Sequence, residues 1–393
     1  MRTRLLLALL CSAVLLAGCS SAVAGTATAP AVPSPGLLDT VDLADVDDDL
    51  TPRDAVALDD GSFLVLLAGD TRIGRGPGSA LVELVPGADG LAVGTVTAGA
   101  PYAGGGFGAE VHVADDGTVV TVGPVLSGDG GDDEEALDVA FTVQAPGAEE
   151  PELRVLPADP QLGTADRATA VLSPDGRTLY AALRWYVVGG DEVTRLAAVD
   201  VATGTVTASA DLQVAAPGGA TVAGLALRPD GGLVALVTTY RAPGEGDSDA
   251  VLAEYDAGLR LVGAPVDVIG DGSEGHGHAL QVLADGTAVV SLSTSGADHR
   301  LVTVRDGAVL AAHALPHLAA EVAVSPDGRV WLNLGDGDVH TVAPVDLATG
   351  EVGEQVILCE DRGAPTDLAL SADGGILLAS GVCAGADVAH LVG

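Results

Sequence analysis

Lysine is absent from this 393-residue sequence, and all 17 of its basic residues are arginine. Against 55 acidic residues, they leave a formal net charge of -38 at pH 7. A charge of this size repels the phosphate backbone of nucleic acids and the headgroups of anionic lipids. No nucleic acid partner is therefore expected.

Aromatic residues are also scarce, at 3% of the chain, although hydrophobic residues make up 48%. A buried core must therefore consist of Val, Leu and Ala carried on strands or small helices. The length fits either two average domains or one large repeat array, so length does not decide the architecture.

Several short functional patterns are missing. There is no Gly-x-Ser-x-Gly sequence of the kind that holds a nucleophilic serine. The acidic segments at 45–50, 126–138 and 240–250 lack the glycine and glutamate spacing of an EF-hand calcium loop. The glycine run at 104–108 has no helix after it, which a phosphate cradle requires. These absences exclude the most easily recognised catalytic and calcium sites.

The N-terminus has the features of an export signal. Residues 1–18 place Arg2 and Arg4 before an apolar run that is too short to span a bilayer. The following Leu-Ala-Gly-Cys, ending at Cys19, resembles the lipobox of bacterial lipoproteins. That resemblance implies cleavage before Cys19, a lipid on its thiol and a membrane anchor facing outside the cytoplasm. An ordinary signal peptide with an incidental cysteine is the alternative.

The segment that follows is expected to be a tether. Residues 19–35 are small, uncharged and interrupted by proline, which suits a flexible, extended linker. The folded domain is expected at 36–393. Of four cysteines, Cys11 leaves with the leader and Cys19 carries lipid, so Cys359 and Cys383 remain. In an oxidising compartment these two are expected to form a disulfide, with two buried free thiols as the alternative.

The most informative feature is a repeated phrase. "LSPDGRTLYAAL" at 172–183 returns as "VSPDGRVWLNL" at 324–334. Apolar residues three and five positions before each Asp-Gly predict a strand with one buried face, and Asp-Gly predicts a tight turn into a second strand. Seven copies occur at intervals of 42 to 59 residues, with turn aspartates at Asp60, Asp116, Asp175, Asp230, Asp285, Asp327 and Asp373.

A second hairpin follows the first in each repeat. It is clearest in "VDVATGTVTAS" at 199–209 and "VDLATGEVGEQV" at 345–356. One four-stranded sheet cannot bury both faces alone, so such units stack around an axis. The Ser-Pro-Asp-Gly turn followed by Asp-x-x-Thr-Gly resembles the YVTN and WD-repeat type of β-propeller over about residues 37–393. The regular Gly-His and Trp-Asp dipeptides of WD repeats are missing, and the fold serves many roles, so no partner follows from the resemblance.

The resemblance implies an all-β fold of seven four-stranded antiparallel blades. Only 20 residues follow Asp373, enough for two strands of the last blade after its turn. The last blade therefore lacks its outermost strand. The strand-like segment "LLDTVDLADV" at 37–46 is expected to supply that strand, which closes the ring and removes exposed sheet edges.

In this family's fold, the residue six positions before each turn aspartate lies at the start of the innermost strand, beside the central channel. Asp54, Glu110, Glu321 and Asp367 occupy four of these positions, in blades that become adjacent once the ring closes. Such an arc repels itself unless a cation, an arginine or bound protons compensate it. It predicts a site for Ca²⁺ or another cationic ligand, with a solvated acidic rim as the alternative.

A group of histidines falls in and after blade five. His276 and His278 are two residues apart and share one side of an extended strand, while His299 and His317 lie farther along. With Glu321 they could bind Zn²⁺ or supply a general base. Their spacing matches no recognised metal signature, and loop histidines are usually solvated.

These observations lead us to expect a non-enzymatic, membrane-anchored module that presents an acidic face outside the cytoplasm to a protein, glycan or cationic ligand. The alternative is a metal-assisted propeller enzyme, such as a lactonase or lyase, that uses the histidines with Glu321. A purely structural role in the cell envelope is a third possibility.

Overall fold

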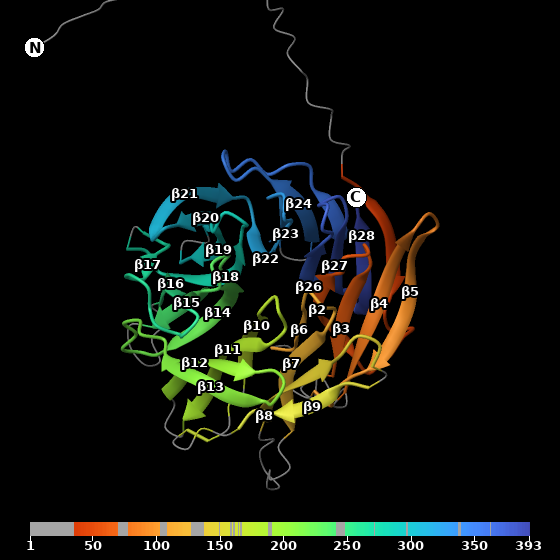
Figure 1. Ribbon diagram of the computed structural model, residues 1–393. Helices are drawn as coiled ribbons and strands as arrows, with labels where there is room; N and C mark the ends of the chain where they lie inside the picture. Colours follow the sequence, from red (N-terminus) through yellow and green to blue (C-terminus); the bar gives the residue numbers. More distant parts are fainter. Residues whose placement is uncertain are drawn as a thin grey trace, which may run out of the picture. The chain divides into compact units, whose positions relative to one another are not determined.

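Seven four-stranded antiparallel sheets arranged around a central axis make up the fold (Figure 1). The computed structural model describes residues 35–393 except 70–77, 103–107, 127–136, 149, 158, 160–161, 164, 166, 188–190, 241–247, 271, 296–297, 337–338 and 362. The leader, Cys19 and most of the tether therefore lie outside the described residues. Among the described residues, none forms a helix long and apolar enough to cross a membrane.

The first four blades each consist of four consecutive strands. Blade 1 contains β2 (Thr51–Ala57), β3 (Phe63–Ala68), β4 (Ser79–Gly87) and β5 (Gly90–Ala98). Blade 2 contains β6 (Glu110–Val113), β7 (Val119–Leu126), β8 (Leu137–Gln144) and β9 (Glu152–Val155). Blade 3 contains β10 (Arg167–Leu172), β11 (Thr178–Val187), β12 (Asp191–Asp200) and β13 (Thr205–Asp211). Blade 4 contains β14 (Ala220–Leu227), β15 (Leu233–Tyr240), β16 (Ser248–Tyr255) and β17 (Val266–Asp267).

The last three blades complete the ring. Blade 5 contains β18 (Gly275–Val282), β19 (Ala288–Thr294), β20 (His299–Arg305) and β21 (Ala308–Leu315). Blade 6 contains β22 (Leu318–Val324), β23 (Val330–Asp336), β24 (Val339–Val345) and β25 (Val356–Cys359). Blade 7 contains β26 (Gly363–Leu370), β27 (Leu377–Cys383), β28 (Ala386–Val392) and β1 (Leu37–Asp42).

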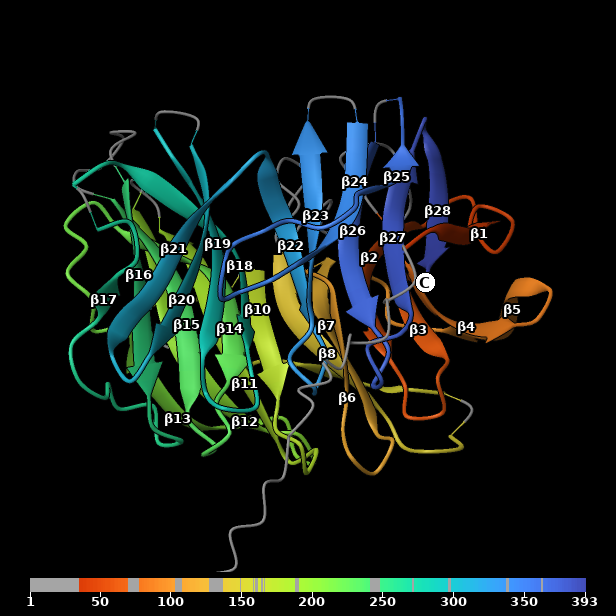
Figure 2. The same ribbon diagram turned by 90° about the horizontal axis from the view of Figure 1, so that it is seen from above.

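Blade 7 confirms the predicted ring closure. Its outermost strand is β1, which runs antiparallel to β28 and pairs Thr40 with His390. The backbone amide of Gly36 also donates a hydrogen bond to the carbonyl of Gly393, with an N–O distance of 2.9 Å. The two ends of the folded unit are thus held in one sheet, and Figure 2 shows β1 beside β28. Because closure occurs within residues 35–393, this part contains the complete ring.

The turn that the repeated phrase predicts is present in all seven blades. Every glycine that follows a turn aspartate has a positive φ, between 66° and 88°, which glycine adopts without steric cost. The aspartate side chain commonly accepts the amide hydrogen two residues later, as in the 2.9 Å bond from Thr118 to Asp116. The Asp-Gly pair therefore fixes the turn through both of its residues.

The core lies between the blades, where apolar faces of neighbouring sheets meet. On β15, Leu233 and Ala235 belong to a buried cluster shared with blade 3, while Val234 and Leu236 belong to one shared with blade 5. Side chains alternate between the two faces of a strand, so both faces of this blade are buried. Each blade is thus covered on both sides by its neighbours.

A disulfide joins blade 6 to blade 7, as the sequence predicted. It connects Cys359, the last residue of β25, to Cys383, the last residue of β27, with a Cα–Cα distance of 5.6 Å. The bond closes a loop with a sequence separation of 24. It braces the blade in which the two ends of the ring meet.

We predict that replacing Cys359 and Cys383 together by alanine lowers the free energy of unfolding by about 3 kcal/mol, because a loop of this size no longer constrains the unfolded chain. Guanidinium unfolding under non-reducing conditions measures the loss. Adding a reductant should lower the stability of the wild type and leave the double variant unchanged. Equal stability of the two proteins without reductant would contradict the prediction.

Candidate functional site

The start of each innermost strand determines what faces the central channel. In five of the seven blades, the ladder between the first and second strands shifts register at this point, as a β-bulge does. The shift falls immediately before Asp54 in β2, Glu321 in β22 and Asp367 in β26. A bulge changes the direction in which nearby side chains point. It recurs at the position where the sequence predicted channel-facing carboxylates.

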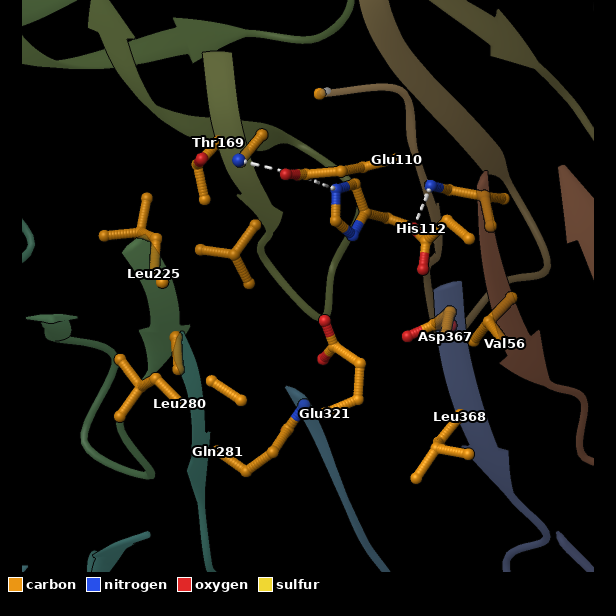
Figure 3. Close-up of a pocket in the computed structure, with 18 of the residues that line it drawn as sticks. Val56, Glu110, His112, Thr169, Leu225, Leu280, Gln281, Glu321, Asp367 and Leu368 are labelled. Carbon is orange, nitrogen blue, oxygen red and sulfur yellow. Dashed lines mark hydrogen bonds and ion pairs between the residues drawn. The ribbon is translucent and has the colours of Figure 1, made fainter. Parts of the chain in front are cut away.

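The predicted carboxylates lie together. A cavity of about 530 Å³ on the axis, which we call the channel cavity, is lined by Asp54, Glu110, Glu321 and Asp367. Figure 3 shows Glu110, Glu321 and Asp367 around this cavity. Arg53 also lines it and provides one positive charge. The ring therefore brings together acidic residues that are up to 313 positions apart (367 minus 54).

Three of these carboxylates also connect neighbouring blades. Asp367 accepts the amide hydrogen of Ala55 at 2.7 Å, and Asp54 accepts that of Val111 at 2.5 Å. Glu110 accepts that of Ala170 at 2.7 Å. Each acceptor lies six residues before its turn aspartate, and each donor lies five before the turn aspartate of the next blade. The bonds form one repeated contact that runs from blade 7 through blades 1 and 2 to blade 3.

Glu321 differs from the other three. No hydrogen bond or ion pair joins its side chain to another described residue. Burial, followed by the charges of Asp54 and Glu110, raises its pKa from 4.5 to about 8. Burial also raises the pKa of Asp367, with Asp54 and Glu321 adding to the effect. Burial and neighbouring negative charges thus favour the protonated form of both Glu321 and Asp367.

His112 is a channel residue that the sequence analysis missed. It lines the channel cavity, and its Nε2 lies 3.5 Å from Oε2 of Glu110. Both side chains are largely buried, with 19% and 21% of their surface exposed. Burial raises the pKa of Glu110, and the contact with His112 opposes that rise. The sequence could have identified His112, because it lies two residues after Glu110 and residues two apart on a strand share a face.

The four predicted histidines do not form one group around the channel. Only His278 lines the channel cavity; its Nε2 lies 2.8 Å from Oγ of Ser293. Burial, together with the nearby His276 and His299, lowers the pKa of His278. Ser293 is paired across the sheet with both His276 and His299, so three of the four predicted histidines lie around Ser293, beside the register shift at His278. His276 also contacts Ser248 of blade 4.

The remaining histidine of the set, His317, lies between β21 and β22, in the connection from blade 5 to blade 6. It is not among the described residues that line the channel cavity. Of the predicted histidine group, the channel cavity therefore combines His278 with Glu321.

The described residues form no ready-made metal cage in the channel cavity. Among the described residues, the only three acidic, histidine or cysteine side chains whose ligand atoms all lie within 4.8 Å of one another are the exposed Asp47, Asp48 and Asp49. No three of the four channel carboxylates have ligand atoms that all lie this close to one another. Their arrangement suits a cation that fills part of a large cavity better than a bare ion held by three protein ligands.

Comparison with known proteins establishes the fold but no family. The chain matches no protein family model and no curated protein sequence. Virginiamycin B lyase from Staphylococcus aureus is similar in structure, with a TM-score of 0.58, 10% identity, and coverage of 90% of this chain and 98% of that one. A catalytically inactive variant of that lyase with quinupristin gives a TM-score of 0.60 at the same identity and coverage.

The WD40 domain of Pan2 from Neurospora crassa is also similar, with a TM-score of 0.59, 10% identity, and coverage of 91% of this chain and 95% of that one. The neighbours thus include both an enzyme and a WD40 domain. At 10% identity these similarities support a β-propeller and leave the function open.

We predict that Glu321→Gln makes the protein more stable than the wild type at pH 9. A carboxyl with a pKa of about 8 in the folded state and 4.5 as its ordinary value binds its proton more tightly when folded. Its contribution therefore favours folding below about pH 4.5, declines as pH rises toward 8 and stays constant above that. At about 1.4 kcal/mol for each unit of pKa difference, the variant should gain up to a few kcal/mol.

Urea unfolding at intervals between pH 5 and pH 9 measures this difference. The advantage of Glu321→Gln should shrink as the pH approaches 5. Glu354→Gln, at an exposed position, is the matched control and should show no such pH-dependent difference. If the free energy of unfolding of Glu321→Gln and that of the wild type change with pH in the same way, the pKa of Glu321 is not raised in the folded protein.

Proposed function

We propose that this protein is a membrane-anchored, extracytoplasmic binding module that takes a cationic ligand in its channel cavity. The observation that carries the proposal is the convergence of Asp54, Glu110, Glu321 and Asp367 on one cavity of about 530 Å³. Burial, followed by the charges of neighbouring carboxylates, raises the pKa of three of them, Glu110, Glu321 and Asp367. A bound cation relieves the repulsion between these charges, and Glu321 is the carboxylate that carries no blade-connecting bond.

The chemical character of the ligand follows from the size and spacing of the site. A cavity of this volume has room for an organic cation, and no three of its four carboxylates lie close enough together to enclose a small ion tightly. Calcium or another divalent cation with water in its coordination shell is a second possible occupant. A protein or glycan partner would present a positively charged group to the same place.

We predict that residues 35–393 are stabilised by a cation in a saturable way. Thermal unfolding is followed with hexylamine, Ca²⁺, Mg²⁺ or Zn²⁺, with a chelator as the metal-free reference. At a hundredfold excess over Kd, binding adds about 2.7 kcal/mol, which raises Tm by several degrees. Glu321→Gln should reduce the ligand-induced rise, and Glu354→Gln should retain it. If no cation raises Tm, or if Glu321→Gln responds like the wild type, the channel is not a cation site.

A metal-assisted enzyme, such as a lyase or lactonase, is a second candidate function. The favouring observation is that His278 and His112 line the cavity that holds Glu321. Figure 3 shows His112 beside Glu110 in this cavity. The lowered pKa of His278 keeps its imidazole neutral, and a neutral imidazole can bind a metal or accept a proton. Stabilisation by Zn²⁺ alone, lost in His278→Ala, would favour this candidate over the binding module.

The anchoring half of the proposal rests on the leader and Cys19. In a bacterium that processes lipoproteins, we predict that Cys19→Ser moves the protein from the membrane fraction to the soluble extracytoplasmic fraction. The reason is that two acyl chains hold a protein on a bilayer, whereas a chain with this net charge has little affinity for one. Cys11→Ser, inside the expected leader, is the matched control. A Cys19→Ser protein that stays in the membrane fraction would contradict lipid anchoring.

A further inference from the structure

The channel cavity has two levels with different chemistry. Its four carboxylates all lie six residues before a turn aspartate, and we call this the acidic level. Three or four residues before the turn aspartates, four partly exposed apolar side chains line the same cavity. We call this second set the apolar level; it consists of Val56, Val171, Leu227 and Val282.

The two levels are separated along the innermost strands. A strand rises about 3.3 Å per residue, so a difference of two or three residues is about 7 to 10 Å. The cavity follows five consecutive residues of β14, from Ala223 to Leu227, and five of β18, from His278 to Val282. It is therefore long enough to hold a ligand whose two ends differ in chemistry.

Negative charge is confined to one of the two levels. No Asp or Glu is among the described residues that line the cavity nearer to the turns than the acidic level. The polar side chains there are those of His112 and Gln281, and neither carries a negative charge. Figure 3 shows Leu225 and Leu280 across the cavity from Asp367. A positive charge is therefore attracted to the acidic level and not to the apolar level.

The acidic level suits a cation that donates hydrogen bonds. The carboxylate of Glu321 makes no hydrogen bond to another described residue, and a primary ammonium group has three N–H donors. A quaternary ammonium has no such donor, and proteins commonly hold it against the faces of aromatic rings. No Phe, Tyr or Trp is among the described residues that line the channel cavity. The lining therefore favours a primary ammonium over a quaternary one.

The apolar level adds a second requirement, because partly exposed apolar side chains are stabilised when an apolar group covers them. We propose that the channel cavity binds a primary ammonium that carries an apolar chain, with the ammonium at the acidic level and the chain along the apolar level. This inference rests on the proposed cation site and specifies the class of its ligand. A hydrated metal ion, in contrast, would use the acidic level alone.

The first experiment varies the length of the chain. Binding of methylamine, butylamine and hexylamine to residues 35–393 is measured by calorimetry at pH 7 and constant ionic strength. We expect each added methylene group to lower Kd about threefold to fourfold, because it buries apolar surface at the apolar level. Equal Kd values for butylamine and hexylamine would overturn the proposed ligand class and leave the cation site standing. If no amine binds, the cation site itself is wrong.

The second experiment assigns the two effects to the two levels. Glu321→Gln should weaken the binding of all three amines by a similar factor, whereas Leu227→Ser should weaken hexylamine about tenfold and leave methylamine unchanged. Leu153→Ser, at a leucine that is 44% exposed on β9, is the matched control and should bind all three like the wild type.

A second variant covers the case in which Leu227→Ser fails to fold, as judged by circular dichroism. Val282→Thr then takes its place, with a loss of about threefold for hexylamine. A hexylamine Kd that stays at the wild-type value in the folded variant would show that the apolar level does not contact the chain. The wild-type series decides the matter even if neither variant folds.

The third experiment tests the placement of the ligand with 1,6-diaminohexane and 1-hexanol. The second ammonium of the diamine would have to enter the apolar level, so we expect it to bind at least about tenfold more weakly than hexylamine. Tighter binding of the diamine would mean that the ligand lies across the acidic level, which overturns the inference. Hexanol lacks the charge and should bind more weakly than hexylamine. If it binds equally well, the cation site is wrong as well.

Discussion

The structure depends on the need of each four-stranded sheet to bury two apolar faces. Blade 4 illustrates it: one side of β15 packs on blade 3 and the other on blade 5, so the blade has no solvent-facing side of its own. A blade that stacks on one neighbour still has an apolar face to bury on its other side. Only closure of the stack into a ring buries both faces of every blade. The pairing of β1 with β28 completes that closure. The disulfide from Cys359 to Cys383 reinforces it at the same blade.

The ring also explains why acidic residues stand where they repel each other. Asp367, Asp54 and Glu110 accept amide hydrogens from the next blade, so part of their electrostatic cost is offset by hydrogen bonds that join blades. Where this position is Gly224, a side chain would meet Leu280 of the next blade at 2.8 Å, so the backbones approach closely instead. Glu321 makes no such hydrogen bond to another described residue, and it is not a glycine at a close approach of two backbones. Its carboxylate therefore does not serve to join the described parts of the blades.

The sequence by itself determined the repeat, its turns and its ring. Asp-Gly with apolar residues three and five positions earlier is a local pattern, and local patterns predict strands and turns directly. Counting six residues back from each turn aspartate also identified Asp54, Glu110, Glu321 and Asp367. This works because a residue at the same distance from the turn has the same position in every blade. Only the tertiary structure decided which carboxylates bond to the next blade, and that His278 alone of the four predicted histidines lines the channel cavity. Those outcomes depend on strand register and on contacts between blades, and neither is encoded in the spacing along one chain.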